Sequence, residues 1–360
     1  MRRFTVAALA MATVAVAGPA QADDGPCAGW REAGLIDGLT CTGVDRGVII
    51  AATPRSDAYA EIFPVAFERF AQVFAPTDQK IALVVQPEVS KELASALAAD
   101  GYKALPWVDS EAKAAMLKAS IVKQVEAQTA SLPEAQRAAV LEQALAKANA
   151  SAPAIADPVI EAGSIAHEIG HLLFNSYFDR AEPGSADGTP RYGSRAPDWL
   201  DEAAAVALEN EALTRSRYAQ TRAAFAADGT VLPFPMQTYL TMDHPSLRAA
   251  QAIKGRGGEG AKAVSLSGDE AKAFLEASGG NPVVFYRQTR LFIDFLTERS
   301  GNPRILFSMA KAYRDGGDLA GWLAQSGGEN GLPTTLDGLE TEFEAWARAT
   351  LAEDPADEPA

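Results

Sequence analysis

Two of the three histidines in this 360-residue chain stand four positions apart, in the stretch SIAHEIGHLLF from Ser164 to Phe174. Glu168 directly follows the first of them. On an α-helix four residues advance by about 400°, so His167 and His171 would lie on one face, about 6 Å apart along the axis. Two imidazoles placed in this way can bind one metal ion. Glu168 can flank a water on that ion and act as general base without being a ligand.

A purely structural explanation of the same residues is that the histidines border a buried helix face formed by Ile165, Ile169, Leu172 and Leu173. The HExxH spacing favours the metal hypothesis, because it specifies a general base as well as two ligands. Gly170, inside the motif, adds no side chain beside the site. A catalytic Zn²⁺ commonly takes three protein ligands and keeps its fourth position for water. A third ligand must therefore come from another segment.

The best source of that ligand is the stretch DWLDEAAAVALENEAL, from Asp198 to Leu213. Asp198 is predicted to cap a helix there, and Asp201 and Glu202 lie in its first turn. Either carboxylate could be the ligand. The alternative is that both are first-turn carboxylates favoured only by the helix dipole.

This segment resembles the gluzincins, the zinc metallopeptidases that include thermolysin and the alanyl aminopeptidases. Their third ligand is a glutamate, carried in many members by a WLxEGxA segment, which WLDEAAA matches at Trp199, Leu200, Glu202 and Ala204, with Ala203 in place of glycine. The resemblance implies that Glu202 is the third zinc ligand. The gap from His171 to Glu202 is longer than in the family, and the excess is a Gly-, Pro- and Ser-rich stretch typical of a surface loop. No segment of the G-x-M-E-N type precedes His167, so an endopeptidase is favoured over an aminopeptidase.

Two residues compete to stabilise the oxyanion of the reaction. FYRQTRLFIDFLTERSG resembles a gluzincin helix that begins with a tyrosine, which puts Tyr286 in that position. Its phenol could donate a hydrogen bond to a tetrahedral intermediate. Thermolysin-like enzymes use a downstream histidine instead, and His244 in TMDHPS is the candidate. The alternatives are a core or surface tyrosine, and a histidine that belongs to a loop or to a pocket wall.

The elements that must position these residues change in character along the chain. Gly47–Thr53 and Ile81–Pro87 are predicted strands, with a helix between them that starts near Pro64. Ser110–Ala150 is predicted to form a two-helix hairpin, followed by a linker over Ala150–Val159. Strand-like runs are nearly absent after that, and Gly255–Gly260 is predicted to be a loop.

The predicted fold class is α+β, with a small N-terminal α/β part followed by a mostly helical part. The resemblance implies a zincin-like arrangement, with the active site between the two parts. The strand over Ile81–Pro87 is a candidate for an exposed edge that aligns an extended peptide.

The first residues are typical of an export signal: two arginines, an apolar run too short to span a bilayer, and Ala20-Gln21-Ala22 as a cleavage site. The expected organisation is a signal peptide over 1–22, an α/β region over 23–160, a zinc-binding helical region over 161–352 and an acidic tail over 353–360. Cys27 and Cys41, the only cysteines, are expected to pair in an oxidising compartment. The protein is therefore expected in the periplasm or outside the cell.

The composition, with 48% hydrophobic and 22% charged residues, is that of a globular chain, and its net charge of −15 disfavours nucleic acid and anionic lipid as partners. No stable membrane insertion is expected. The expected function is that of an exported zinc metallopeptidase with a peptide or protein substrate. Two alternatives are an inactive peptidase-like binding protein and a zinc hydrolase of a non-peptide amide. The sequence leaves the oligomeric state open.

Overall fold

The structure, a computed structural model, describes residues 25–52, 56–86, 88–155, 157–178, 193–249 and 280–353. Several predictions fall on other residues and lie outside the described part of the chain. These are the signal peptide, most of the surface loop between His171 and Glu202, the loop Gly255–Gly260 and nearly all of the acidic tail.

The N-terminal part is built around a four-stranded mixed sheet with the order β1-β2-β3-β4. The strands are β1 (Thr40–Val44), β2 (Gly47–Ala51), β3 (Lys80–Val85) and β4 (Tyr102–Trp107). β1 pairs antiparallel with β2, whereas β2, β3 and β4 are parallel. The two predicted strands correspond to β2 and β3. β3 is interior to the sheet, so the prediction of an exposed edge at Ile81–Pro87 is wrong; in the described residues the edge on that side is β4.

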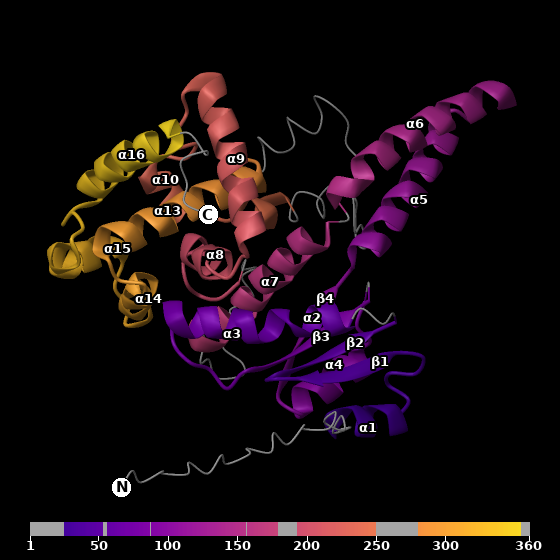
Figure 1. The fold of residues 1–360 in the computed structure, drawn as a ribbon, viewed down its shortest axis with the longest axis horizontal. Coiled ribbons are helices and arrows are strands. Elements are labelled where there is room, and N and C mark those ends of the chain that lie inside the picture. Colours follow the sequence, from indigo (N-terminus) through magenta and orange to yellow (C-terminus); the bar gives the residue numbers. More distant parts are fainter. Residues whose placement is uncertain are drawn as a thin grey trace, which may run out of the picture.

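Alternating side chains of the sheet pack on two different layers. Ile49, Ile81 and Leu83 face a core shared with α3 (Ile62–Val73) and α7 (Pro158–Phe178). Val48 and Val84 face the other way, toward α1 (Gly25–Glu32) and α4 (Lys91–Ala99). Figure 1 shows these layers above and below the sheet, with the short α2 (Ser56–Ala60) beside it. The two central strands are almost continuously apolar, over Gly47–Ala51 and Ile81–Val85, because both of their faces are covered.

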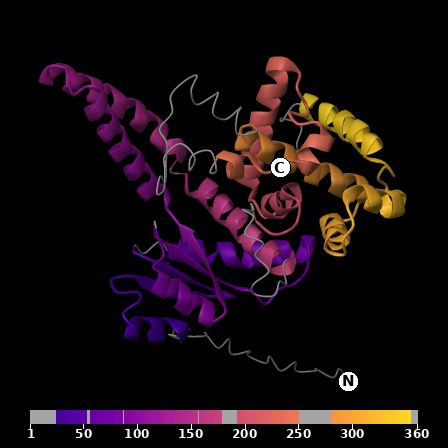
Figure 2. The same ribbon diagram turned by 180° about the vertical axis from the view of Figure 1, so that it is seen from behind.

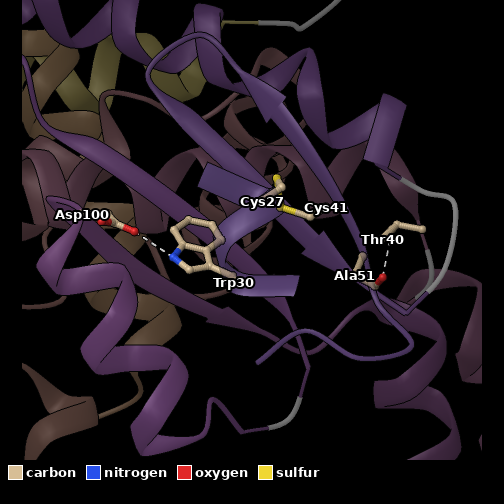
Figure 3. The surroundings of a disulfide bond; sticks show 6 residues. All are labelled: Cys27, Trp30, Thr40, Cys41, Ala51 and Asp100. Atoms are coloured by element: carbon tan, nitrogen blue, oxygen red, sulfur yellow. Dashed lines mark hydrogen bonds between the residues drawn. A yellow bond between two sulfur atoms is a disulfide. The ribbon is translucent and has the colours of Figure 1, made fainter. Parts of the chain in front are cut away.

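The predicted disulfide is present: Cys27 of α1 is bonded to Cys41 of β1, with 5.9 Å between the Cα atoms. Figure 3 shows this bond beside Trp30, whose indole Nε1 donates to Asp100 Oδ2 at 2.8 Å. The two contacts fasten α1 to β1 and to the C-cap residue of α4.

The helical hairpin is also present, as α5 (Ser110–Gln128) and α6 (Glu134–Ile155). It projects from the rest of the molecule in both views (Figures 1 and 2). The linker predicted over Ala150–Val159 is wrong, because α6 continues to Ile155 and α7 begins at Pro158. The high helix propensity of alanine prevails there over the single Pro153.

From α7 onward the described residues form helices and no strand. The elements are α8 (Asp198–Val206), α9 (Glu211–Asp228), α10 (Met236–Thr241), α13 (Pro282–Ser300), α14 (Ile305–Arg314), α15 (Leu319–Trp322) and α16 (Leu336–Ala352). A fully buried aromatic core holds them together, including Trp199, Phe285, Phe292 and Phe343. The α+β prediction, with a small sheet part followed by a mostly helical part, is confirmed. None of the helices in the described ranges has the length and apolar character needed to cross a membrane.

Candidate metal centre

The histidine pair lies in the middle of α7, a helix whose start is set by local sequence. Asp157 caps it, because its Oδ1 accepts a hydrogen bond from the Val159 amide at 2.8 Å. Pro158 occupies the first helical position, where its missing N–H costs nothing. Ile165 and Ile169 are fully buried on another face of the helix. His167 and His171 are consequently held on a face of their own.

Gly170 lets α8 approach this helix closely. A Cβ atom at Gly170 would lie 2.7 Å from Ala205 Cα, closer than real Cβ contacts allow, and a tight 3.1 Å from Ala204 O. The small residues of α8 complete the fit, since Ala203, Ala204 and Ala205 are all fully buried. This contact brings the first turns of α8 against the histidine face of α7.

The three residues predicted as metal ligands are brought together by this packing. Ligand atoms of His167, His171 and Glu202 all lie within 4.8 Å of one another. His167 Nε2 is 3.4 Å from Glu202 Oε1, and His171 Nε2 is 3.6 Å from Glu202 Oε2. Glu202 is completely buried, and a buried carboxylate normally pairs with a cation or a metal. The group could therefore hold a metal ion within the helical part of the fold.

Both histidines are oriented by carboxylates at their other ring nitrogen. His167 Nδ1 donates to Glu209 Oε1 at 2.9 Å, and His171 Nδ1 donates to Asp201 Oδ1 at 2.7 Å. Ionised carboxylates only accept hydrogen bonds, so Nδ1 carries a hydrogen and Nε2 is the atom left to bind a metal beside Glu202. Such outer carboxylates are a regular feature of histidine metal sites. Asp201, the alternative third ligand, is engaged here with His171.

Glu209 belongs to a second buried cluster behind His167. Arg217 of α9 forms a two-point ion pair with the Glu209 carboxylate, in which Arg217 Nε lies 2.5 Å from Oε2. Burial alone would raise the pKa of Glu209, but the hydrogen bonds from Arg217 and His167 lower it below its ordinary value. Arg69 of α3 also donates to the backbone oxygens of Leu208 and Glu209. Glu209 is therefore a fixed anion.

The pKa of His171 is shifted upward, whereas that of Glu209 is shifted downward. Burial opposes protonation, but the Asp201 hydrogen bond and the nearby carboxylates of Glu202 and Glu168 raise the pKa of His171 to about 9. Metal ligation requires the neutral imidazole. Metal uptake at neutral pH would thus release a proton here.

Glu168 lies on the α7 face that points to the edge of the sheet. It follows Glu161 by two helical turns, so both side chains leave the helix in nearly the same direction. Glu161 accepts hydrogen bonds from Trp107 Nε1 at 2.9 Å and from the Ser110 amide at 2.9 Å. Lys113 Nζ lies 4.0 Å from the centre of the Trp107 ring. This side of the site is consequently bounded by the end of β4 and the first turn of α5.

The two oxyanion candidates lie beside the histidine pair and stack on each other. Tyr286 is partly exposed, and its ring centre is 5.8 Å from that of His167 and 5.3 Å from that of His244. The Arg217 guanidinium lies 4.9 Å from the centre of the Tyr286 ring. His244 is 0% exposed, and burial, reinforced by the neighbouring His171 and His167, lowers its pKa to about 3.

Asp198 has a different role from the one predicted. Pro197 is the N-cap of α8 and Asp198 is its first helical residue. The Asp198 side chain does not cap its own helix; its Oδ2 accepts a hydrogen bond from the His244 amide at 2.6 Å. Because Pro197 is the N-cap, the Asp198 carboxylate is available to the loop that contains His244.

Sequence reasoning missed the roles of Glu209, Arg217 and Lys113. Glu209 had one detectable signal, since it is an acidic residue directly after the alanine-rich apolar run of α8. Arg217 and Lys113 had none, because each contacts its partner through tertiary packing alone.

Comparison with known proteins identifies no relative. No family model, curated protein or solved structure matches the chain. The function must therefore be inferred from the residues of the site.

Proposed function

We propose that the protein is an exported zinc metallopeptidase of the gluzincin type, with His167, His171 and Glu202 as zinc ligands. The observation that carries this proposal is the convergence of two imidazole Nε2 atoms and one buried carboxylate, each imidazole being fixed at Nδ1 by its own acidic partner. A donor set of two histidines and one glutamate is that of a catalytic zinc site with one open position. Export is supported by the N-terminal sequence and by the Cys27–Cys41 disulfide.

In the proposed mechanism of peptide hydrolysis, Glu168 and Tyr286 have different roles. When bound, zinc would supply a Lewis acid for the scissile carbonyl and lower the pKa of a water. Glu168, partly exposed on the neighbouring helix face, takes the proton of that water and delivers it to the leaving amine. The Tyr286 phenol donates a hydrogen bond to the oxyanion. Burial supports Tyr286 over His244 for this step, because a residue with no exposed surface cannot meet a substrate.

The decisive experiment compares the purified mature protein with Glu168→Gln. We expect about one zinc per chain in both proteins, and cleavage of a mixed peptide library by the wild type only, because Glu168 acts on water and does not hold the ion. Loss of zinc from Glu168→Gln would contradict its role. Zinc binding without any peptide cleavage by the wild type would favour the alternatives, a binding protein or a hydrolase of non-peptide amides.

A further inference from the structure

All three histidines of the chain surround one carboxylate. The Nε2 atoms of His167 and His171 lie 3.4 and 3.6 Å from oxygens of Glu202, and His244 Nε2 lies 3.8 Å from Glu202 Oε2. Both Glu202 and His244 are 0% exposed. The third histidine is nevertheless outside the group of potential metal ligands found among the described residues, which contains only the other two and Glu202. Its position calls for another explanation.

Backbone hydrogen bonds determine which nitrogen of His244 carries the proton. The Ser246 amide donates to His244 Nδ1 at 3.1 Å, so Nδ1 is an acceptor. An imidazolium would have a hydrogen on that atom and could not accept this bond. The ring is therefore neutral, with its hydrogen on Nε2, which faces Glu202. His167 and His171 instead carry a hydrogen on Nδ1, where each donates to a carboxylate.

The His244 ring is also held in place mechanically. Its amide donates to Asp198 at the start of α8, the helix that carries Glu202. The Phe285 ring packs edge-on against it at 4.7 Å and 80°, and the Tyr286 ring stacks on it at 5.3 Å and 26°. A ring confined by two aromatic neighbours and tied to α8 through its backbone keeps a constant orientation toward Glu202.

We infer that His244 is a positioning residue for the third metal ligand, holding the Glu202 carboxylate through an Nε2–H directed at Oε2. The inference rests on the proposed metal site. At 3.8 Å the contact is longer than a hydrogen bond, so it acts as a charge–dipole attraction, which is strong where water is absent. With a metal bound, His167 and His171 would offer the Nε2 lone pair to the ion, whereas His244 offers the hydrogen on its Nε2 to the ligand.

The test is zinc affinity, measured by competition with a chelator in His244→Phe and His244→Gln. Phenylalanine keeps the ring and removes the donor, so zinc should bind about 10- to 100-fold more weakly. Glutamine keeps an N–H donor and should restore part of that loss. Thr289→Val is the matched control, because it removes the buried hydrogen bond to Tyr239 in the same core without facing Glu202. It should lower the melting temperature and leave zinc affinity unchanged.

A second measurement remains informative even if His244→Phe does not fold. In ¹⁵N-histidine spectra of the metal-free wild type, one histidine should be neutral and protonated at Nε2 only, and His244→Gln should remove that signal. The other two should carry a hydrogen on Nδ1. A proton on Nδ1 of His244 would overturn the inference, as would unchanged zinc affinity in His244→Phe. Failure of the wild type to bind zinc would instead refute the proposed function, and the tautomers would still be readable.

Discussion

His167 Nδ1 and Glu209 Oε1 are 2.9 Å apart in a buried hydrogen bond, and the same carboxylate is paired with Arg217. Glu209, in the turn between α8 and α9, therefore connects His167 of α7 with Arg217 of α9 through one carboxylate. We predict that Glu209→Gln weakens zinc binding by about 10- to 100-fold, because the imidazole loses its orienting anion and Arg217 is left buried without a counter-charge.

The check is a zinc affinity measurement, with Glu211→Gln as control. Among the described residues Glu211 pairs only with Arg215, at the surface, so its loss should leave zinc affinity unchanged. Equal affinities in all three proteins would refute the role of Glu209.

Gly170→Ala should disrupt the site without touching any ligand. The added methyl group would collide with the backbone of Ala205, so α7 and α8 must separate. Overpacking of this kind costs about 1–3 kcal/mol of the free energy of unfolding. Zinc affinity should fall as well, because Glu202 moves with α8. Gly29→Ala in α1 is the control, since nothing lies within 4 Å of its new Cβ. Normal zinc affinity in Gly170→Ala would show that the close helix contact is not needed.

Tyr286→Phe should separate catalysis from metal binding. It removes one hydroxyl and keeps the ring that stacks on His244, so folding and zinc content should be unchanged. Loss of one oxyanion donor lowers turnover about 10²- to 10³-fold, with a much smaller effect on substrate affinity. Steady-state kinetics on a cleaved peptide provide the measurement. Wild-type turnover in this variant would remove Tyr286 from the mechanism.

Asp198 should make the stability of the metal-free protein depend on pH. Burial raises the pKa of Asp198 to about 6 from 3.8, with the nearby Asp243 and Asp201 adding to the rise and the His244 amide opposing it. Between these values the folded state binds the proton more tightly than the unfolded state, so the stabilising contribution of Asp198 falls as the pH rises from about 4 to about 6.

Asp198→Asn keeps an acceptor for the His244 amide and cannot titrate. The free energy of unfolding, measured by urea denaturation of chelator-treated protein, should therefore decrease more for wild type than for Asp198→Asn over that interval. A difference between the two proteins that is constant with pH would contradict the raised pKa.

The parts of the site that were predictable from sequence are those determined by local spacing. His167 and His171 are four residues apart on a helix, so their alignment follows from helical geometry alone. Glu202 was identified by its immediate neighbours in WLDEAAA. The strands β2 and β3 and the α5–α6 hairpin were similarly visible in local composition.

The remaining features depend on contacts between distant segments. β4 is the edge strand because of pairing order, which the sequence YKALPW does not encode locally. The partners of His167 and His171 are acidic residues like many others in an acidic chain, and only packing selects Glu209 and Asp201. The burial of His244 has the same origin, because it requires α8 and α13 to close around a loop.

The packing of Gly170 against Ala205 has a consequence for how the protein would acquire its ion. The two histidines are aligned once α7 has formed, whereas Glu202 joins them only after a separate helix has docked. A chain that crosses a membrane unfolded would therefore carry no ion with it. For the proposed exported zinc enzyme, loading would thus follow translocation and draw on the zinc supply of the destination compartment instead of the cytoplasmic one.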